Sequence, residues 1–156
     1  MPKIDRGKAP VRTTTVYPAE FKHVCEGREK AALGNVAGLT QFGVNLTRLK
    51  PDAASALRHW HENEDEFIYV LEGEIVLIED GGETVLGPRD CAGFKAGVAN
   101  GHQLVNKSQR DALYLEIGTR AASERVHYPG ADLVMERDGR GMRFLHKSGE
   151  PYPPES

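Results

Sequence analysis

Short apolar runs that alternate with polar positions recur along the middle of the chain. In the clearest run, Phe42, Val44 and Leu46 fall on one face of an extended segment, with polar residues or glycine between them. Alternation with a period of two is typical of a half-buried β-strand. Further strands are predicted over 59–61, 67–71, 74–79, 84–86, 91–94, 102–106 and 112–117, and near 133–136 and 143–146.

Turn signals separate these runs about every eight to twelve residues. They include Pro51-Asp52, the segment 80–83 and Gly87-Pro88. No segment has a convincing helical period, and the glycines at 34, 38 and 43 argue against a helix there. Many short strands joined by turns predict an all-β sandwich or barrel.

The length of 156 residues suits one domain. We expect residues 1–30 to form an N-terminal arm with a short strand at 13–17. Residues 31–120 are predicted to form the barrel core. Residues 121–156 are predicted to supply further strands and a tail that pack on the barrel.

The runs 67–71 and 75–78 are apolar on both faces, so the face that points away from the barrel interior must also be covered. The arm, the tail or a second subunit could cover it. Trp60 belongs to the same outer face if the histidines beside it point inward. We therefore expect a homodimer that packs through sheet surfaces.

Composition narrows the class of protein. The net charge is −3 and no stretch gathers Lys and Arg densely, which argues against nucleic acid or anionic membrane as the main partner. The longest apolar run is too short to span a bilayer, and no signal-peptide core is present. Cys25 and Cys91 are too few for a disulfide framework, so we expect buried, reduced thiols in a cytoplasmic protein.

Candidate chemistry lies between residues 57 and 73. His59 and His61 are two apart, so on a strand both imidazoles point to one face while Trp60 points to the other. Glu66 shares a face with Ile68 and Val70, and a turn at 62–65 could bring that face beside the histidines. Two imidazoles and a carboxylate that converge in this way suit a divalent metal.

These residues match a known family. His59, His61, Glu66 and Gly73 reproduce the first signature of the cupins, which is histidine-x-histidine, four residues, glutamate, six residues and glycine. The second signature corresponds to residues 89–106, which keep the glycine at 97, the histidine at 102 and the asparagine at 106. The chain therefore resembles the cupin superfamily, and in particular its small single-domain members of the mannose-6-phosphate isomerase-like group.

The resemblance implies a double-stranded β-helix, the cupin or jelly-roll barrel. It also implies that His59, His61, Glu66 and His102 bind one divalent transition metal ion inside the barrel. Mixed nitrogen and oxygen ligation suits Zn, Mn, Fe, Ni or Co, and the sequence does not choose among them.

The chain departs from the cupin signatures at several positions. Asp52-Ala53 and Arg89 replace glycines, Lys95 replaces a proline, and four residues rather than two separate Gly97 from His102. None of these changes removes a predicted ligand. Asp52 can adopt the left-handed conformation that the missing glycine would supply.

Other polar residues are predicted to lie outside the metal site. We expect Asn106 to have a structural role. Four loop carboxylates are expected to be solvated, namely Glu62, Glu64, Asp65 and Glu72. The remaining histidines, His23, His127 and His146, are expected not to be ligands.

Three functions fit this site, and each involves a small-molecule ligand. A metal-dependent isomerase of a sugar phosphate is slightly favoured, with Lys95, Arg48 or Arg58 as phosphate anchors, although Arg58 lies on the wrong face of its strand. A metal-dependent dioxygenase uses the same ligand set. A non-catalytic small-molecule-binding barrel is the third alternative, and the sequence assigns no catalytic residue.

Overall fold

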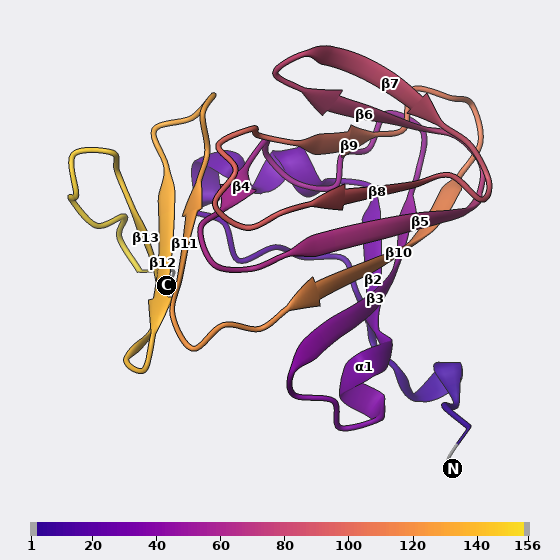
Figure 1. The fold of residues 1–156 in the computed structure, drawn as a ribbon, viewed down its shortest axis with the longest axis horizontal. Coiled ribbons are helices and arrows are strands. Elements are labelled where there is room, and N and C mark those ends of the chain that lie inside the picture. The colour runs from indigo at the N-terminus through magenta and orange to yellow at the C-terminus, as the bar shows by residue number, and fades with distance from the viewer. Residues whose placement is uncertain (1–2, 155–156) are drawn as a thin grey trace.

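A computed structural model describes residues 3–154, which form mainly antiparallel strands (Figure 1). The all-β prediction is therefore confirmed. The helices are short, namely the 3-10 helices η1 (Arg6–Lys8) and η2 (Ala19–Cys25) and the single turn α1 (Leu33–Val36). The strands are β1 (Val11–Arg12), β2 (Arg28–Ala32), β3 (Phe42–Leu49), β4 (Trp60–His61), β5 (Glu66–Glu72), β6 (Ile75–Glu79), β7 (Gly82–Leu86), β8 (Cys91–Phe94), β9 (Gln103–Val105), β10 (Ala112–Thr119), β11 (Glu124–His127), β12 (Val134–Asp138) and β13 (Gly141–Leu145).

The strands form three sheets. A six-stranded sheet has the order β1-β2-β3-β10-β5-β8, and a three-stranded sheet has the order β7-β6-β9. A four-stranded sheet, β13-β12-β11-β4, joins the C-terminal strands to the HxH segment. In Figure 1 the C-terminal strands stand on one side of the molecule, and β4 lies between them and the other two sheets.

The main core is formed largely by apolar side chains on the inward faces of the six-stranded and three-stranded sheets. On β5, Ile68 and Val70 are 3% and 0% exposed, whereas Phe67 and Leu71 on the opposite face are 40% and 38% exposed. This confirms the predicted phase of the strand. The buried residues of this core are Leu49, Ala53, Ile68, Val70, Ile75, Leu77, Leu86, Leu104, Ala112 and Tyr114.

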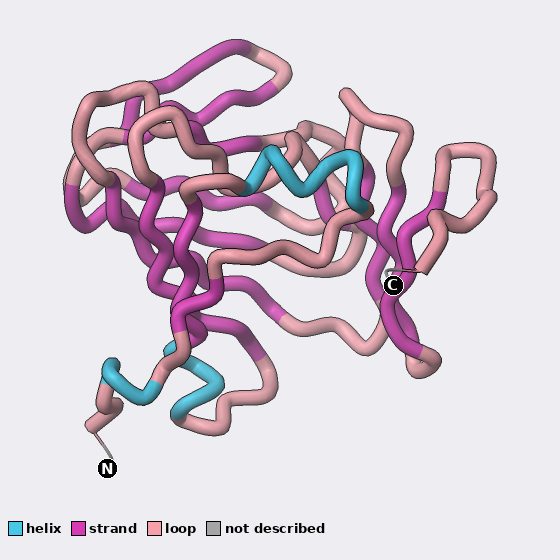
Figure 2. Tube along the Cα trace, turned by 180° about the vertical axis from the view of Figure 1, so that it is seen from behind, coloured by secondary structure: helices cyan, strands magenta, loops and turns pink. Residues whose placement is uncertain are grey.

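A second core connects the N-terminal segment to the C-terminal sheet. Tyr17 and Cys25 pack there with Val126, Tyr128 and Leu133. Figure 2 shows η2 and its flanking loop running from the strands of the six-stranded sheet toward the C-terminal strands. The N-terminal segment therefore closes one side of the space between the two cores.

Two turns confirm that other residues can replace the missing signature glycines. Asp52 has φ 66° and Arg89 has φ 78°, both in the left-handed region. At Gly73, with φ 77°, an added Cβ would lie 2.6 Å from the Asp111 carbonyl oxygen. That position therefore requires glycine for both conformation and space.

The N-terminal third differs from prediction in three ways. The strand expected at 13–17 is instead β1 at Val11–Arg12, because only these residues pair with β2, and the chain beyond leaves the sheet. Strand β2 and helix η2 were not predicted. The turn α1 forms despite Gly34, where an added Cβ would lie 3.1 Å from the Val44 backbone nitrogen, so glycine lets α1 approach β3.

The predicted positions of Cys91 and Trp60 need correction or refinement. Cys91 is exposed rather than buried, because Ala92 and Phe94 take the inward positions of the short strand β8. Cys25 is buried, as predicted. Trp60 stacks on His127 with a ring-centroid distance of 4.2 Å, so β11 covers part of its outer face within the same chain.

Among residues 3–154, no helix combines the length and apolar character needed to cross a membrane.

Candidate metal centre

The structure brings together the four residues predicted to bind a metal. His61 lies on β4, and His59, just before it, forms an isolated antiparallel bridge with His102. Glu66 begins β5, which follows the turn after β4. Strands β4 and β5, together with the residues that immediately precede β4 and β9, thus supply all four side chains from segments that are adjacent in space.

The Oε2 atom of Glu66 is the meeting point of the cluster. It lies 2.8 Å from Nε2 of His102, 3.3 Å from Nε2 of His61 and 3.6 Å from Nε2 of His59. The atom is buried, yet none of these contacts has the geometry of a hydrogen bond. Three imidazole nitrogens and a carboxylate oxygen are a donor set that divalent transition metals accept. His59, His61 and Glu66 could hold a metal ion, and His102 adjoins them.

Neighbouring groups orient the histidine rings. Nδ1 of His59 donates to the Leu57 carbonyl oxygen at 2.7 Å, which leaves Nε2 free to bind a metal. The His102 ring stacks on Phe94 with a centroid distance of 3.6 Å and an interplanar angle of 5°. These contacts fix both rings before any ion binds.

Glu124 is a functional candidate that the sequence did not reveal. Its Oε1 accepts hydrogen bonds from the backbone nitrogens of Glu62, Asn63 and Arg125 at 3.1, 3.0 and 2.7 Å. Its Oε2 is buried without a hydrogen-bond partner and lies 3.5 Å from Nδ1 of His61. The carboxylate is therefore fixed beside the nitrogen of His61 that faces away from Glu66.

Glu64 was predicted to be a solvated loop charge, and this prediction is wrong. The residue is 9% exposed, and its Oε1 accepts from the Ala121 backbone nitrogen at 2.9 Å and from Arg137. Its Oε2 lies 3.9 Å from Nδ1 of His61. Burial is possible because Arg137 compensates the negative charge. His61, Glu64 and Glu124 form a second group that could hold a metal ion.

The cluster shifts the pKa values of its members in different directions. Burial raises the pKa of Glu66, but the contacts with His102, His59 and His61 outweigh it and hold that pKa well below its usual value. Burial lowers the pKa of His61, yet Glu66, Glu124 and Glu64 together raise it above the ordinary value. Burial lowers the pKa of His102, and the contact with Glu66 only partly offsets this.

A cavity of about 260 Å³ opens beside the cluster. This volume is just below the ~300–1,000 Å³ typical of sites for drug-sized ligands, so it suits a small metabolite. Three tyrosines line it, and burial raises the pKa of Tyr17 to about 12 and those of Tyr114 and Tyr128 well above the usual value. The Tyr114 hydroxyl is buried without a hydrogen-bond partner.

A second cavity of about 190 Å³ also borders the cluster. It shares His61, Glu66, Phe94 and His102 with the larger cavity and is otherwise lined by residues that include Trp60 and Lys95.

The three cations that the sequence suggested as phosphate anchors do not line the larger cavity. Lys95 lies at the smaller one. Arg48 pairs with Glu29 and Asp111, and Arg58 pairs with Asp80 at 2.5 Å. The two arginines are thus engaged elsewhere.

The chain resembles several known proteins. A family model of the cupin domain matches residues 45–118. A sugar phosphate isomerase of the cupin superfamily from Silicibacter pomeroyi is 43% identical, with a TM-score of 0.94 and 97% coverage of both chains. A candidate sugar phosphate isomerase from Acidithiobacillus ferrooxidans is 26% identical, with a TM-score of 0.73 and coverage of 82% of this chain and 81% of that one.

More distant structures share the fold alone. A polyketide cyclase from Streptomyces resistomycificus is 20% identical, with a TM-score of 0.62 and coverage of 76% of this chain and 79% of that one. No curated protein sequence matches the chain. The extent and identity of the Silicibacter match, together with the barrel and the arrangement of the signature residues, establish that this chain belongs to the cupin superfamily.

Proposed function

We propose that the protein is a metal-dependent isomerase of a sugar phosphate. The observation that carries the proposal is the 43% identity, over 97% of both chains, to a cupin sugar phosphate isomerase. The histidine and glutamate cluster supports it, because the cluster borders a cavity of about 260 Å³ that suits a small polar metabolite.

His59, His61, Glu66 and His102 are the ligands in this proposal, and they would hold one divalent ion of Zn, Mn, Fe, Ni or Co. A bound ion of this kind supplies Lewis-acid polarisation of a sugar carbonyl and its neighbouring hydroxyl. The low pKa of Glu66 favours this role, since the carboxylate is ionised at neutral pH. The Leu57 carbonyl holds His59 in the tautomer that presents Nε2 to the ion.

The cavity residues position the sugar. Tyr17, Tyr114 and Tyr128 remain protonated at neutral pH because burial raises their pKa values. Each phenol can therefore both donate to and accept from a sugar hydroxyl. The free hydroxyl of Tyr114 gains a partner when a polar ligand enters.

Anaerobic turnover tests this proposal. Metal-loaded protein is mixed with a panel of aldose and ketose phosphates, and interconversion is followed by NMR without oxygen. We expect one isomer pair to reach equilibrium with the loaded protein and not after chelation. Absence of turnover for the whole panel, or oxygen uptake that depends on an added substrate, would contradict the isomerase assignment.

We also propose that the protein forms a homodimer through the outer face of β5. Phe67 and Leu71 are large apolar side chains that the rest of the chain leaves exposed. Burial of such residues against a second copy would stabilise the dimer. Light scattering at micromolar concentration should give a dimer mass for the wild type and a monomer mass for Leu71→Glu. A wild-type monomer would exclude the dimer.

A further inference from the structure

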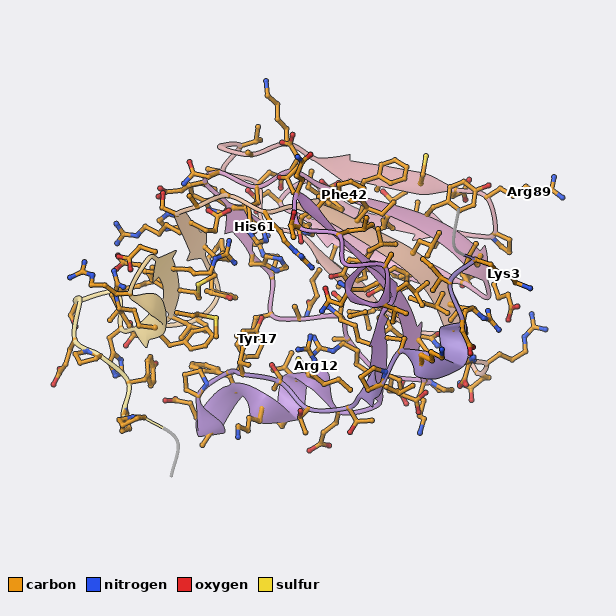
Figure 3. All side chains as sticks on the ribbon, turned by 90° about the horizontal axis from the view of Figure 1, so that it is seen from below. Lys3, Arg12, Tyr17, Phe42, His61 and Arg89 are labelled. Atoms are coloured by element: carbon orange, nitrogen blue, oxygen red, sulfur yellow. The ribbon has the colours of Figure 1, made fainter. Side chains whose placement is uncertain are left out.

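Three cationic side chains line the same cavity as the histidine cluster. Arg12 lies on β1, and Arg28 and Lys30 lie on β2. In Figure 3, Arg12 and Tyr17 lie on one side of the open space and His61 lies on the other. The cavity thus has a metal-binding end and a separate cationic end, both open to one ligand.

The pairing of β1 with β2 concentrates positive charge. Arg12 and Lys30 are direct partners in the antiparallel register. Residues directly opposite each other have Cβ atoms about 4.5–5.5 Å apart on one face, and like charges in this arrangement are destabilising. Arg12 is exposed, and the ion pairs among residues 3–154 give it no acidic partner. An anion between the two side chains would relieve the repulsion.

Arg28 adds a buried guanidinium that no carboxylate compensates. It is 7% exposed, and it donates through Nη1 to the Ser55 carbonyl oxygen at 2.5 Å and through Nη2 to that of Thr14 at 3.3 Å. Its Nε is buried without a hydrogen-bond partner. Both partners are neutral carbonyls, so the charge of Arg28 lacks a counterion in the described part of the chain.

One carboxylate faces this cationic end. Glu116 lies 2.9 Å from the ammonium of Lys30 and also accepts from the Thr47 hydroxyl at 3.3 Å. Three cations and one carboxylate leave two uncompensated positive charges. A phosphate monoester carries about −1.5 to −2 at neutral pH and matches this charge, whereas a sugar acid carries only one.

We infer that Arg12, Arg28 and Lys30 bind the phosphate group of the substrate, while its carbonyl end lies at the histidine cluster. This assignment rests on the proposed sugar phosphate isomerase function. Guanidinium groups suit the role because their planar array of donors matches phosphate oxygens. Arg12 at the cavity mouth is the member whose truncation least disturbs the fold, since its side chain makes no hydrogen bond within residues 3–154.

The experiment compares Arg12→Ala with Arg48→Ala. Both changes remove one arginine from the six-stranded sheet, but Arg48 pairs in register with Glu29 and so points away from the cavity. Metal-loaded wild type and both variants are titrated calorimetrically with inorganic phosphate, and metal content is measured in each. We expect phosphate to bind about tenfold or more weakly to Arg12→Ala, since a charge-assisted contact is lost, and with wild-type affinity to Arg48→Ala.

Substrate kinetics supply the second readout. For any sugar phosphate that turns over, kcat/KM should fall at least about tenfold in Arg12→Ala, and Arg12→Lys should recover part of it. Equal phosphate affinity in the two alanine variants would overturn the assignment. Equal wild-type affinity for a sugar phosphate and for the matching sugar acid would also overturn it. If no sugar turns over but the phosphate contrast persists, the anion site stands and the isomerase assignment falls.

Discussion

Oε2 of Glu124, which has no hydrogen-bond partner, lies 3.5 Å from Nδ1 of His61, and the Glu124 side chain is fully buried. Three backbone nitrogens hold its other oxygen. A carboxylate behind a histidine fixes the ring and strengthens the opposite nitrogen as a metal ligand. Glu124 thereby links the C-terminal sheet to the candidate metal centre.

Glu124→Gln should weaken metal binding about 10–100-fold, the usual effect of losing such a partner. The amide keeps the size of the side chain but removes the charge beside His61. Competition with a chromogenic chelator measures the affinity. Glu136→Gln is the matched control, because Glu136 lies on β12 of the same sheet and pairs with Arg143 away from the cluster. Equal affinity in the two variants would remove Glu124 from the metal centre.

Single alanine variants of His59, His61, Glu66 and His102 should each lose most of the bound metal. Wild-type protein should gain about 2.7 kcal/mol of unfolding free energy at an ion concentration about 100 times Kd, and the variants should not. Elemental analysis and thermal denaturation with and without the ion provide the two measurements. His146→Ala, whose ring pairs with Asp132, serves as the control. Unchanged metal content in all four variants would refute the ligand set.

Metal occupancy should fall as the solution is acidified through the pKa of His61. The ion requires the neutral imidazole, and the raised pKa of His61 lets protons compete at a higher pH than for an ordinary histidine. Glu66 does not limit binding in this range, because its pKa lies well below the usual value. Loss of metal should therefore begin at a higher pH than it would for a site whose histidines have ordinary pKa values.

Equilibrium dialysis from pH 8 to pH 5 measures this occupancy. In Glu124→Gln the midpoint should move to higher pH, because the roughly 10–100-fold weaker binding outweighs the loss of one charge that raises the pKa of His61. Full occupancy maintained to pH 5 in the wild type would contradict the role of His61.

Gly73→Ala should destabilise the protein by more than about 1–2 kcal/mol, the cost of the left-handed conformation alone. The added Cβ would also meet the Asp111 carbonyl oxygen at 2.6 Å. Urea denaturation measures the change in unfolding free energy. Gly81→Ala is the control, since its Cβ would meet nothing within 4 Å. Equal stability of the two variants would show that the Gly73 turn relaxes freely.

The centre of the chain could be predicted because its pattern is local. The spacing of His59, His61 and Glu66 predicts that two imidazoles share a direction and that a turn brings the carboxylate beside them, and the three side chains do converge. The position of Asp52 in the left-handed region also followed from its place in the turn. Cys91 was misplaced because β8 is short and carries small or apolar residues on both faces, so its phase is ambiguous.

The surroundings of the site depend on pairing between distant segments. Glu124 reaches His61 only because β11 pairs with β4, with Val126 opposite His61. Arg12 reaches the cavity through the register of β1 with β2. No periodic signal reports either contact, since each joins short strands separated by turns and loops. Glu64 was assigned to solvent for the same reason, because its partner Arg137 lies on β12.

The histidine cluster borders two cavities, of about 260 and 190 Å³, that share His61, Glu66, Phe94 and His102. A ligand that fills the larger cavity would leave the histidine cluster accessible from the smaller cavity. Ion exchange and substrate exchange would then use separate entrances. A sugar phosphate could stay in place while the ion is replaced, so the rate of metal exchange would be set by the side of the barrel where Trp60 and Lys95 lie.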